Sequence, residues 1–186
     1  MKNKVFDNGR IHASKNANDV YETGYVALTV SPYDKEFFDE LEPGVRPHIK
    51  ALLDKGYLPI SSCEGHYYDK QNMNWYVMLA LGGNDIDIRM HNIVHRIQHI
   101  PGLYFETRKK VNNTNQSLRK VLELEDKKAE VEYMNKLFLK NYNHYEYLYI
   151  GLFKNSSLLT RLLFSRFSKK LLLNKIIMEF PDERFH

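Results

Sequence analysis

The sequence predicts an α+β protein with a ferredoxin-like, split βαβ core, in which an antiparallel sheet carries both of its helices on one face. Between residues 25 and 110, short apolar runs alternate with helical patterns in the order β-α-β-β-α-β. Two right-handed crossovers in that order give such a sheet. We therefore expect a flexible N-terminal arm at 1–20, the ferredoxin-like core at 21–112, and a helix-strand-helix extension at 113–186 packed on the core.

The first half of the expected core begins with a strand at 25–30, which is apolar and β-branched and lies between Gly and Ser-Pro. A helix start follows at 31–34, with apolar residues at helical spacing behind it. Pro43-Gly44 interrupts this pattern. A second helix is expected at about 47–55, ended by a glycine, and it leads into a strand at 57–61.

The second half of the expected core begins with a strongly apolar strand at 75–81, closed by two glycines. Asn84-Asp85 then caps a helix whose apolar stripe is Ile86, Ile88, Ile93, Val94 and Ile97. Pro101-Gly102 ends this helix before a strand at 103–107.

The extension contains three further patterns. A charged stretch at 117–142 has the periodicity of a helix, and alternation at 145–150 predicts a strand added to a sheet edge. A long basic helix is expected at about 158–177.

Composition and charge narrow the class of protein. The chain has 186 residues, one cysteine and a net charge of +4, and residues 154–186 hold seven Lys/Arg against three acids. A single cysteine excludes an intrachain disulfide framework and suits a reducing compartment. No apolar run reaches the roughly 20 residues that span a bilayer, and no signal peptide is visible. We therefore expect a cytoplasmic protein whose attraction to anions lies in its C-terminal part.

The turn after the strand at 57–61 concentrates the chemically active residue types. It reads Ser61-Ser62-Cys63-Glu64-Gly65-His66. A thiolate nucleophile with a neighbouring imidazole base would make Cys63, Glu64 and His66 catalytic. Backbone N–H groups around the glycine, with the two serine hydroxyls, could instead bind phosphate or carboxylate. An ordinary tight turn with a buried cysteine is the alternative without function.

A metal site is a further alternative. Cys63 and His66 have C-x-x-H spacing, and His91 and His95 lie one turn apart on the same face of the expected helix, as metal-binding pairs do. Brought together, these four residues could hold Zn. The alternative is a solvated histidine face beside the buried stripe.

The segment from about 47 to 82 resembles the wybutosine-pathway tRNA methyltransferase family. The resemblance rests on "GYLPISSCEGH" followed by the strand "WYVMLAL", which includes Trp75. Ser61, Ser62, Cys63 and Gly65 match that family's Thr-Ser-Ser-Cys-Ser-Gly-Arg turn, whereas glutamate and histidine replace its serine and arginine. The resemblance implies tRNA modification with S-adenosylmethionine. The turn is also similar to that of uncharacterised bacterial and phage proteins with a C-x-G-H sequence.

The basic helix and the tyrosines suggest partners. The helix carries Arg161, Arg166, Lys169 and Lys170 beside a Leu/Phe stripe, a pattern that fits phosphates, a partner groove or a membrane surface as well as an ordinary terminal helix. Thirteen tyrosines could provide base-stacking surfaces on a ferredoxin-like sheet. Those singled out are Tyr67, Tyr68, Tyr76, Tyr145, Tyr147 and Tyr149.

Two functional hypotheses follow. In the first, a small cytoplasmic protein binds or modifies RNA or nucleotides through the turn from Ser61 to His66, with Trp75 and the basic helix in support. In the second, a non-enzymatic factor, encoded by a phage for example, binds a protein partner through its basic C-terminal helix.

Overall fold

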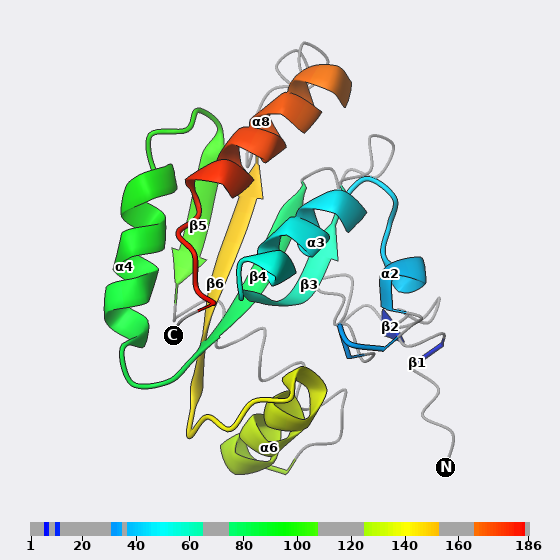
Figure 1. Ribbon diagram of the computed structural model, residues 1–186, viewed down its shortest axis with the longest axis vertical. Coiled ribbons are helices and arrows are strands. Elements are labelled where there is room, and N and C mark those ends of the chain that lie inside the picture. The colour runs from blue at the N-terminus through cyan, green and yellow to red at the C-terminus, as the bar shows by residue number, and fades with distance from the viewer. Residues whose placement is uncertain are drawn as a thin grey trace.

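The structure is a computed structural model of the chain (Figure 1). It describes residues 6–7, 10–11, 31–34, 37–64, 75–107, 125–152 and 166–184. The predicted N-terminal arm falls largely outside this set, but a two-stranded ribbon lies within it, formed by β1 (Phe6–Asp7) and β2 (Arg10–Ile11).

The centre of the molecule is a four-stranded antiparallel sheet in the order β3-β4-β6-β5. Its strands are β3 (Leu58–Cys63), β4 (Tyr76–Gly82), β5 (Leu103–Thr107) and β6 (Tyr145–Leu152). Every residue of β4 is buried, which explains why its sequence is a continuous apolar run and does not alternate. The prediction of an α+β fold is confirmed.

The position of β6 differs from the expectation of an edge strand. β6 pairs with β4 on one side and β5 on the other, so it is an interior strand. In the predicted β-α-β-β-α-β core, the first strand would fill this place between the third and the fourth. That predicted strand, 25–30, lies outside the described residues. The alternation of tyrosine with aliphatic residues in β6 arises because its two faces contribute to two different cores.

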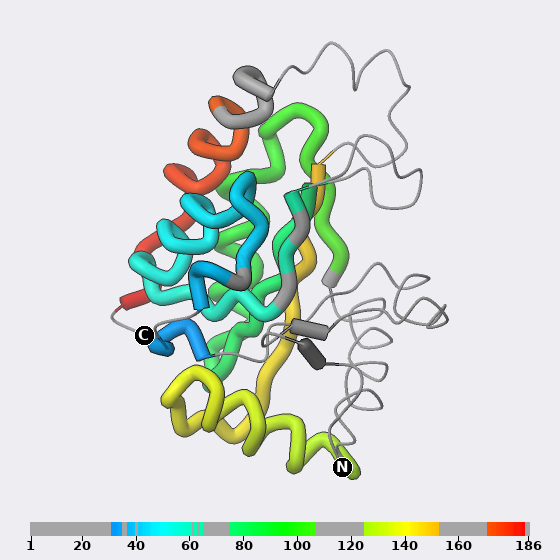
Figure 2. The backbone as a smooth tube through the Cα atoms, turned by 90° about the vertical axis from the view of Figure 1, so that its right-hand side faces the viewer, coloured from blue at the N-terminus to red at the C-terminus, as the bar shows by residue number. Residues whose placement is uncertain are grey.

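Three helices cover one face of the sheet (Figures 1 and 2). They are α3 (Arg46–Asp54), α4 (Ile86–Ile97) and α8 (Arg166–Glu179), and their apolar side chains form one core with β4 and β6. A one-turn helix, α2 (Phe37–Glu40), precedes them and adds Phe37 to this core. On the other face α6 (Lys127–Phe138) packs against β3, β4 and β6 in a second, smaller core.

The helix of the extension is shorter than predicted. Asp126 caps its start by accepting a hydrogen bond from the Ala129 N–H at 2.8 Å. At its other end Leu139 adopts a left-handed conformation with φ of 50°. The Asn135 side chain then bonds both backbone groups of Tyr142, at 3.0 and 2.9 Å, and this turns the chain toward β6. The predicted continuation to residue 142 was therefore wrong. Residues 117–124 lie outside the described part, as do 158–165 before α8.

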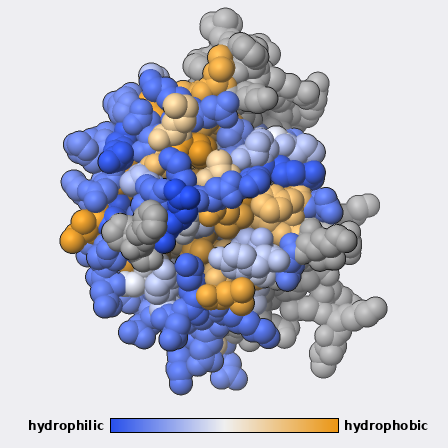
Figure 3. Space-filling view, in the orientation of Figure 1, coloured by the Kyte–Doolittle hydropathy of each residue, from blue (hydrophilic) through white to orange (hydrophobic). Residues whose placement is uncertain are grey.

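On the helix-covered side hydrophilic side chains predominate and hydrophobic ones occur in separate places (Figure 3). Ile88 of α4 is 65% exposed, because the buried stripe of the helix runs through Ile86, Met90, Ile93 and Ile97. Among the described residues, no helix combines the length and apolarity that a membrane crossing requires.

Candidate functional site

The turn singled out by the sequence follows an irregular edge strand. β3 is an edge strand, which accommodates Pro59, and its pairing with β4 shifts register between Pro59 and Ser61. Such bulges re-aim the residues that follow and are common beside functional sites. Beyond the bulge, Ser62 pairs with Val77 and Cys63 with Tyr76. Gly65 and His66 lie outside the described residues.

Glu64 connects this turn to the chain in front of α3. Its carboxylate accepts a hydrogen bond from the Gly44 N–H at 2.6 Å, and its own N–H donates to Glu42 Oε2 at 2.7 Å. A Cβ on Gly44 would lie 2.4 Å from Glu64 Oε2, so only glycine permits this approach. Glu64, predicted to be catalytic, thus links the turn to the segment before α3.

His48 was missed by the sequence reasoning. It is 4% exposed in the first turn of α3, and its Nδ1 lies 3.2 Å from the Gly44 carbonyl oxygen. Its ring meets Trp75 edge to face at 6.3 Å. The available signal was its position four residues before Leu52, on the buried stripe of α3.

Trp75, predicted to bind ligand, belongs to the core that supports the turn. It is 1% exposed, and its indole Nε1 has no acceptor among the described residues. The Trp75 carbonyl accepts a hydrogen bond from the Leu152 N–H at 3.0 Å, which ties the entry of β4 to the end of β6. A large ring fixed here positions Tyr76 and the end of β3.

Three tyrosines contact one another across the sheet face opposite α3, α4 and α8. Tyr76 of β4 stacks on Tyr149 of β6, with ring centroids 5.0 Å apart and planes at 21°. Tyr104 of β5 lies 5.9 Å from Tyr149, and their hydroxyls are 3.4 Å apart. We call these three residues the tyrosine row. Because Cys63 pairs with Tyr76, the row begins next to the end of β3.

Gly151 lets the row lie flat. It pairs with Tyr76 on one side and Tyr104 on the other, and a Cβ there would be 2.5 Å from the Tyr104 hydroxyl. Burial raises the pKa of Tyr149 above its usual value, and the neighbouring Tyr104 adds to the effect. The Tyr149 hydroxyl therefore stays protonated at physiological pH. Tyr104 and Tyr149 are partly exposed.

Two of the predicted stacking tyrosines have a different role. Tyr145 and Tyr147 lie under α6, where their hydroxyls bond to Asn135 and Glu130. Tyr104, which the sequence reasoning did not single out, takes its place in the row because it faces Gly151. Tyr67 and Tyr68 lie outside the described residues.

The remaining predicted residues are spread over the molecule. His91 and His95 are exposed on α4, with ring centroids 6.1 Å apart. Among the described residues no group of three or more His, Cys, Asp or Glu side chains is arranged to hold a metal. Arg166, Lys169 and Lys170 belong to α8, and Arg161 lies outside the described part.

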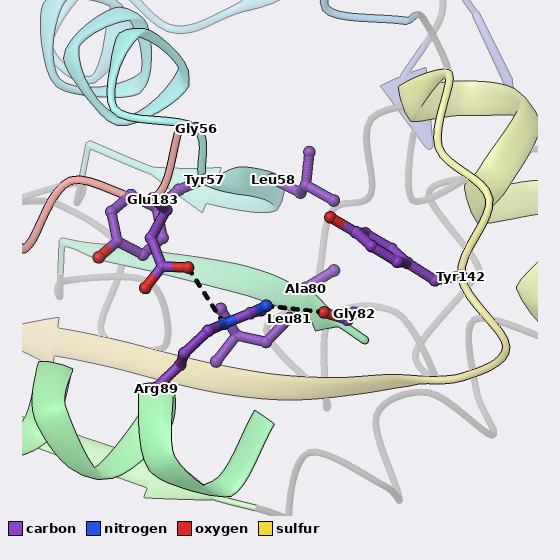
Figure 4. Close-up of a pocket in the computed structure, with 9 residues that line it drawn as sticks. All are labelled: Gly56, Tyr57, Leu58, Ala80, Leu81, Gly82, Arg89, Tyr142 and Glu183. Carbon is purple, nitrogen blue, oxygen red and sulfur yellow. Dashed lines mark hydrogen bonds and ion pairs between the residues drawn. The ribbon is translucent and has the colours of Figure 1, made fainter. Parts of the chain in front are cut away.

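A small hollow lies at the opposite end of β4, beside Gly82 (Figure 4). Arg89 projects into it from α4, donates to the Gly82 carbonyl at 2.9 Å, and forms an ion pair with Glu183 at 3.0 Å. Both side chains are less than a tenth exposed. The enclosed volume is about 10 Å³, roughly the room for one water molecule. This hollow is therefore too small for a substrate.

Comparison of the chain with models of protein families, with curated proteins and with solved structures found no match.

Proposed function

We propose that the protein binds single-stranded RNA or a nucleotide, with a base stacked on the tyrosine row and the turn from Ser61 to His66 beside it. The observation that carries the proposal is the contact of three aromatic rings across β4, β6 and β5. Aromatic side chains on a sheet are a recurrent platform for unpaired bases, since every base has a π face.

The charges beside the turn differ in sign from those of the C-terminal part of the chain. Glu42 and Glu64 put carboxylates beside the turn, and these repel a phosphate. The excess of basic residues lies in 154–186, with Arg166, Lys169 and Lys170 among them, and would attract RNA at long range. It does not contact the bound base, because α8 covers the sheet face opposite the tyrosine row. In the proposed mode the tyrosine row holds the base, and Cys63 pairs with Tyr76 at the edge of the row; catalysis would come from Cys63 and His66. Catalysis by these two residues, with tRNA as substrate, stays a prediction from the sequence.

The fold itself forms part of the proposal. We propose that the sheet is a ferredoxin-like sheet in which β6 takes the place of the first strand. The observations that support this are the strand order and the location of α3, α4 and α8 on one face. The opposite face, which bears the tyrosine row, is the one on which nucleic-acid-binding sheets of this kind stack bases.

The test is titration of the protein with a labelled single-stranded RNA at several salt concentrations. Wild type should bind with an affinity that falls steeply with salt. Tyr104→Ala should bind about 5- to 150-fold more weakly, because stacking on an aromatic ring contributes about 1–3 kcal/mol per base. Tyr33→Ala is the control, since Tyr33 is 59% exposed and lies outside the row. Fluorescence of Trp75, the only tryptophan, reports whether each variant keeps its core.

Two results would contradict the proposal. One is an absence of salt-sensitive RNA binding by wild type. The other is equal affinity of wild type and Tyr104→Ala, which would exclude the tyrosine row from the binding site. Tyr104→Leu, which keeps apolar volume without an aromatic face, separates lost stacking from lost packing.

A second proposal is a protein partner on α8. Leu171 and Met178 are 55% and 78% exposed, and a spacing of seven residues puts them on one side of the helix. Leu173 and Ile176, between them in sequence, are buried in the core. Under this proposal Leu171→Ser with Met178→Ser removes a co-purifying partner, whereas Asn174→Ser and Tyr104→Ala leave it. Retention of the partner by the double variant would contradict it.

A further inference from the structure

α4 carries two histidines, His91 and His95, whose rings face one another on its exposed side. His91 and His95 are one turn apart on a twelve-residue helix and both are exposed. Their rings lie nearly parallel, with centroids 6.1 Å apart and planes at 28°. The buried side of the helix consists of Ile86, Arg89, Met90, Ile93 and Ile97, so the histidines are not needed for packing.

The separation of the rings is close to what one metal ion requires. A zinc ion binds imidazole nitrogen at about 2.0–2.1 Å, and tetrahedral geometry then sets the two ring centroids about 5 Å apart. The observed 6.1 Å exceeds this by about 1 Å. Exposed side chains can close such a gap by small rotations about χ1 and χ2, without movement of the backbone.

The helix beneath the two histidines is held firmly on the sheet, and an exposed carboxylate lies on the same side of it. Ile93 and Ile97 are fully buried, which holds the helix on the sheet while the histidines face away from it. Asp87 lies one turn before His91 and is also exposed, so it adds a negative charge along the same stripe. Carboxylates near ligating histidines commonly orient the ring and strengthen the metal site.

We infer that His91 and His95 form a two-histidine site for a divalent transition metal such as Zn²⁺, Ni²⁺ or Co²⁺. The site lies outside the region of the turn and takes no ligand from Cys63 or His66. Two protein ligands leave at least two coordination positions for water or for a donor atom from another molecule. The inference does not depend on RNA binding, because α4 lies on the sheet face opposite the tyrosine row.

The test is equilibrium dialysis of the full-length chain, without an affinity tag, against Co²⁺, followed by metal analysis and an absorption spectrum. We expect one Co²⁺ per chain and no charge-transfer absorption of the kind that a thiolate ligand produces. His91→Asn and His95→Asn should each weaken binding by at least about tenfold, since even the loss of an outer-shell partner costs about 10–100-fold. His99→Asn is the matched control, because His99 is exposed on the same stretch but follows the helix.

Each other outcome overturns the inference. Thiolate absorption would place Cys63 among the ligands. Unchanged affinity in His95→Asn would put the metal elsewhere, and no stoichiometric Co²⁺ binding by wild type would show that the pair holds no metal. Circular dichroism of the asparagine variants checks that α4 is intact, which is expected because both side chains are exposed.

Discussion

The two ends of β4 differ in the side chains beside them and in the space that these leave for a ligand. At the Gly82 end, buried charges are neutralised by the fold: Arg89 pairs with Glu183 and donates to a backbone carbonyl, and the space beside it holds about one water. At the Tyr76 end, three aromatic rings lie in a row and two of them remain partly exposed. The first arrangement stabilises the chain and leaves no room for a ligand. The second provides a surface that a ligand could use.

The residues that follow α8 form several hydrogen bonds near the Gly82 end of β4. Glu183 N–H donates to the Lys55 carbonyl at 2.7 Å, and Lys55 Nζ donates to the Phe180 carbonyl at 2.6 Å. Tyr57 donates to the Pro181 carbonyl at 2.9 Å and meets Phe180 edge to face. These bonds fasten the residues after α8 across the turn between α3 and β3. This end therefore joins the two halves of the chain.

The largest expected effect is that of Glu183→Ala on stability. Removing one partner of a buried ion pair generally costs about 3–5 kcal/mol, because the other charge is left uncompensated. Arg89 keeps the Gly82 carbonyl and Asp85, 3.3 Å away, so we expect about 3 kcal/mol in chemical denaturation. The matched control is Asp182→Ala, whose side chain is 40% exposed and forms an ion pair with Arg184 at the surface.

A loss for Glu183→Ala no larger than for Asp182→Ala would show that the ion pair does not join the two halves. The double variant Arg89→Met with Glu183→Leu sharpens the test. It removes both charges, and we expect it to recover much of the loss, since apolar replacements of buried pairs are often neutral.

Substituting one glycine near each end of β4 should change protein stability and RNA affinity differently. Gly56 has φ of 92°, and a Cβ there would lie 2.8 Å from the backbone of Glu183. Gly56→Ala should therefore cost about 2 kcal/mol, from left-handed strain and displacement of the C-terminal segment, with RNA affinity unchanged. Gly151→Ala meets only the end of the Tyr104 ring. We expect a cost of about 1 kcal/mol there, with weaker RNA binding because the ring is lifted.

The check is to measure denaturation and RNA titration on both glycine variants. If Gly56→Ala weakened RNA binding as much as Gly151→Ala, the two ends would be coupled and their functional separation would be wrong. If Gly151→Ala bound RNA normally, the flatness of the tyrosine row would be irrelevant to binding.

A smaller effect is expected at the turn itself. Glu64→Gln removes the charge that accepts from the Gly44 N–H, at a cost of about 1 kcal/mol, because hydrogen bonds to charged groups are worth more than neutral ones. Glu132→Gln is the control: its carboxylate lies 3.9 Å from Lys128 on the surface of α6 and should matter little. Thermal unfolding measures both. A Glu64 variant as stable as the control would mean that this carboxylate is available for another role.

The sequence predicted the positions of the helices and strands well and their arrangement in the sheet less well. Periodicity located α3, α4 and the strands β3 to β6 to within a few residues, because each has its own apolar stripe or run. It could not place β6 inside the sheet, since strand pairing depends on contacts between distant segments. The sequence also failed to predict where α6 ends, because that too depends on a contact with a later segment. Asn135 turns the chain there through bonds to Tyr142, and no pattern around Leu139 signals a left-handed residue.

The candidate site was only partly predictable. The turn attracted attention through its residue types, but the bond from Gly44 to Glu64 joins residues twenty apart and depends on the tertiary fold. Likewise Tyr104 enters the row because Gly151 happens to face it across β5 and β6. Arg89 and Glu183 each look like ordinary surface charges in sequence. Only the packing of α8 against both α3 and α4 brings them together.

The smallest expected effect on stability is that of removing one tyrosine hydroxyl at each end of β4. Tyr57→Phe loses the bond to Pro181, at about 0.5–1 kcal/mol near neutral pH, whereas Tyr104→Phe loses the longer contact of 3.4 Å with the Tyr149 hydroxyl and should cost less. Burial, with the charge of Glu183 as a second cause, raises the pKa of Tyr57 above the ordinary tyrosine value of about 10. Above about pH 10 the unfolded chain therefore releases a proton that the folded chain retains, and wild type loses stability. Because Tyr57→Phe lacks this group, its deficit relative to wild type should shrink as the pH rises through 10, in denaturation measured from pH 7 to 11. A deficit that stayed constant would mean that Tyr57 ionises equally in both states, and that the Gly82 end is open to solvent after all.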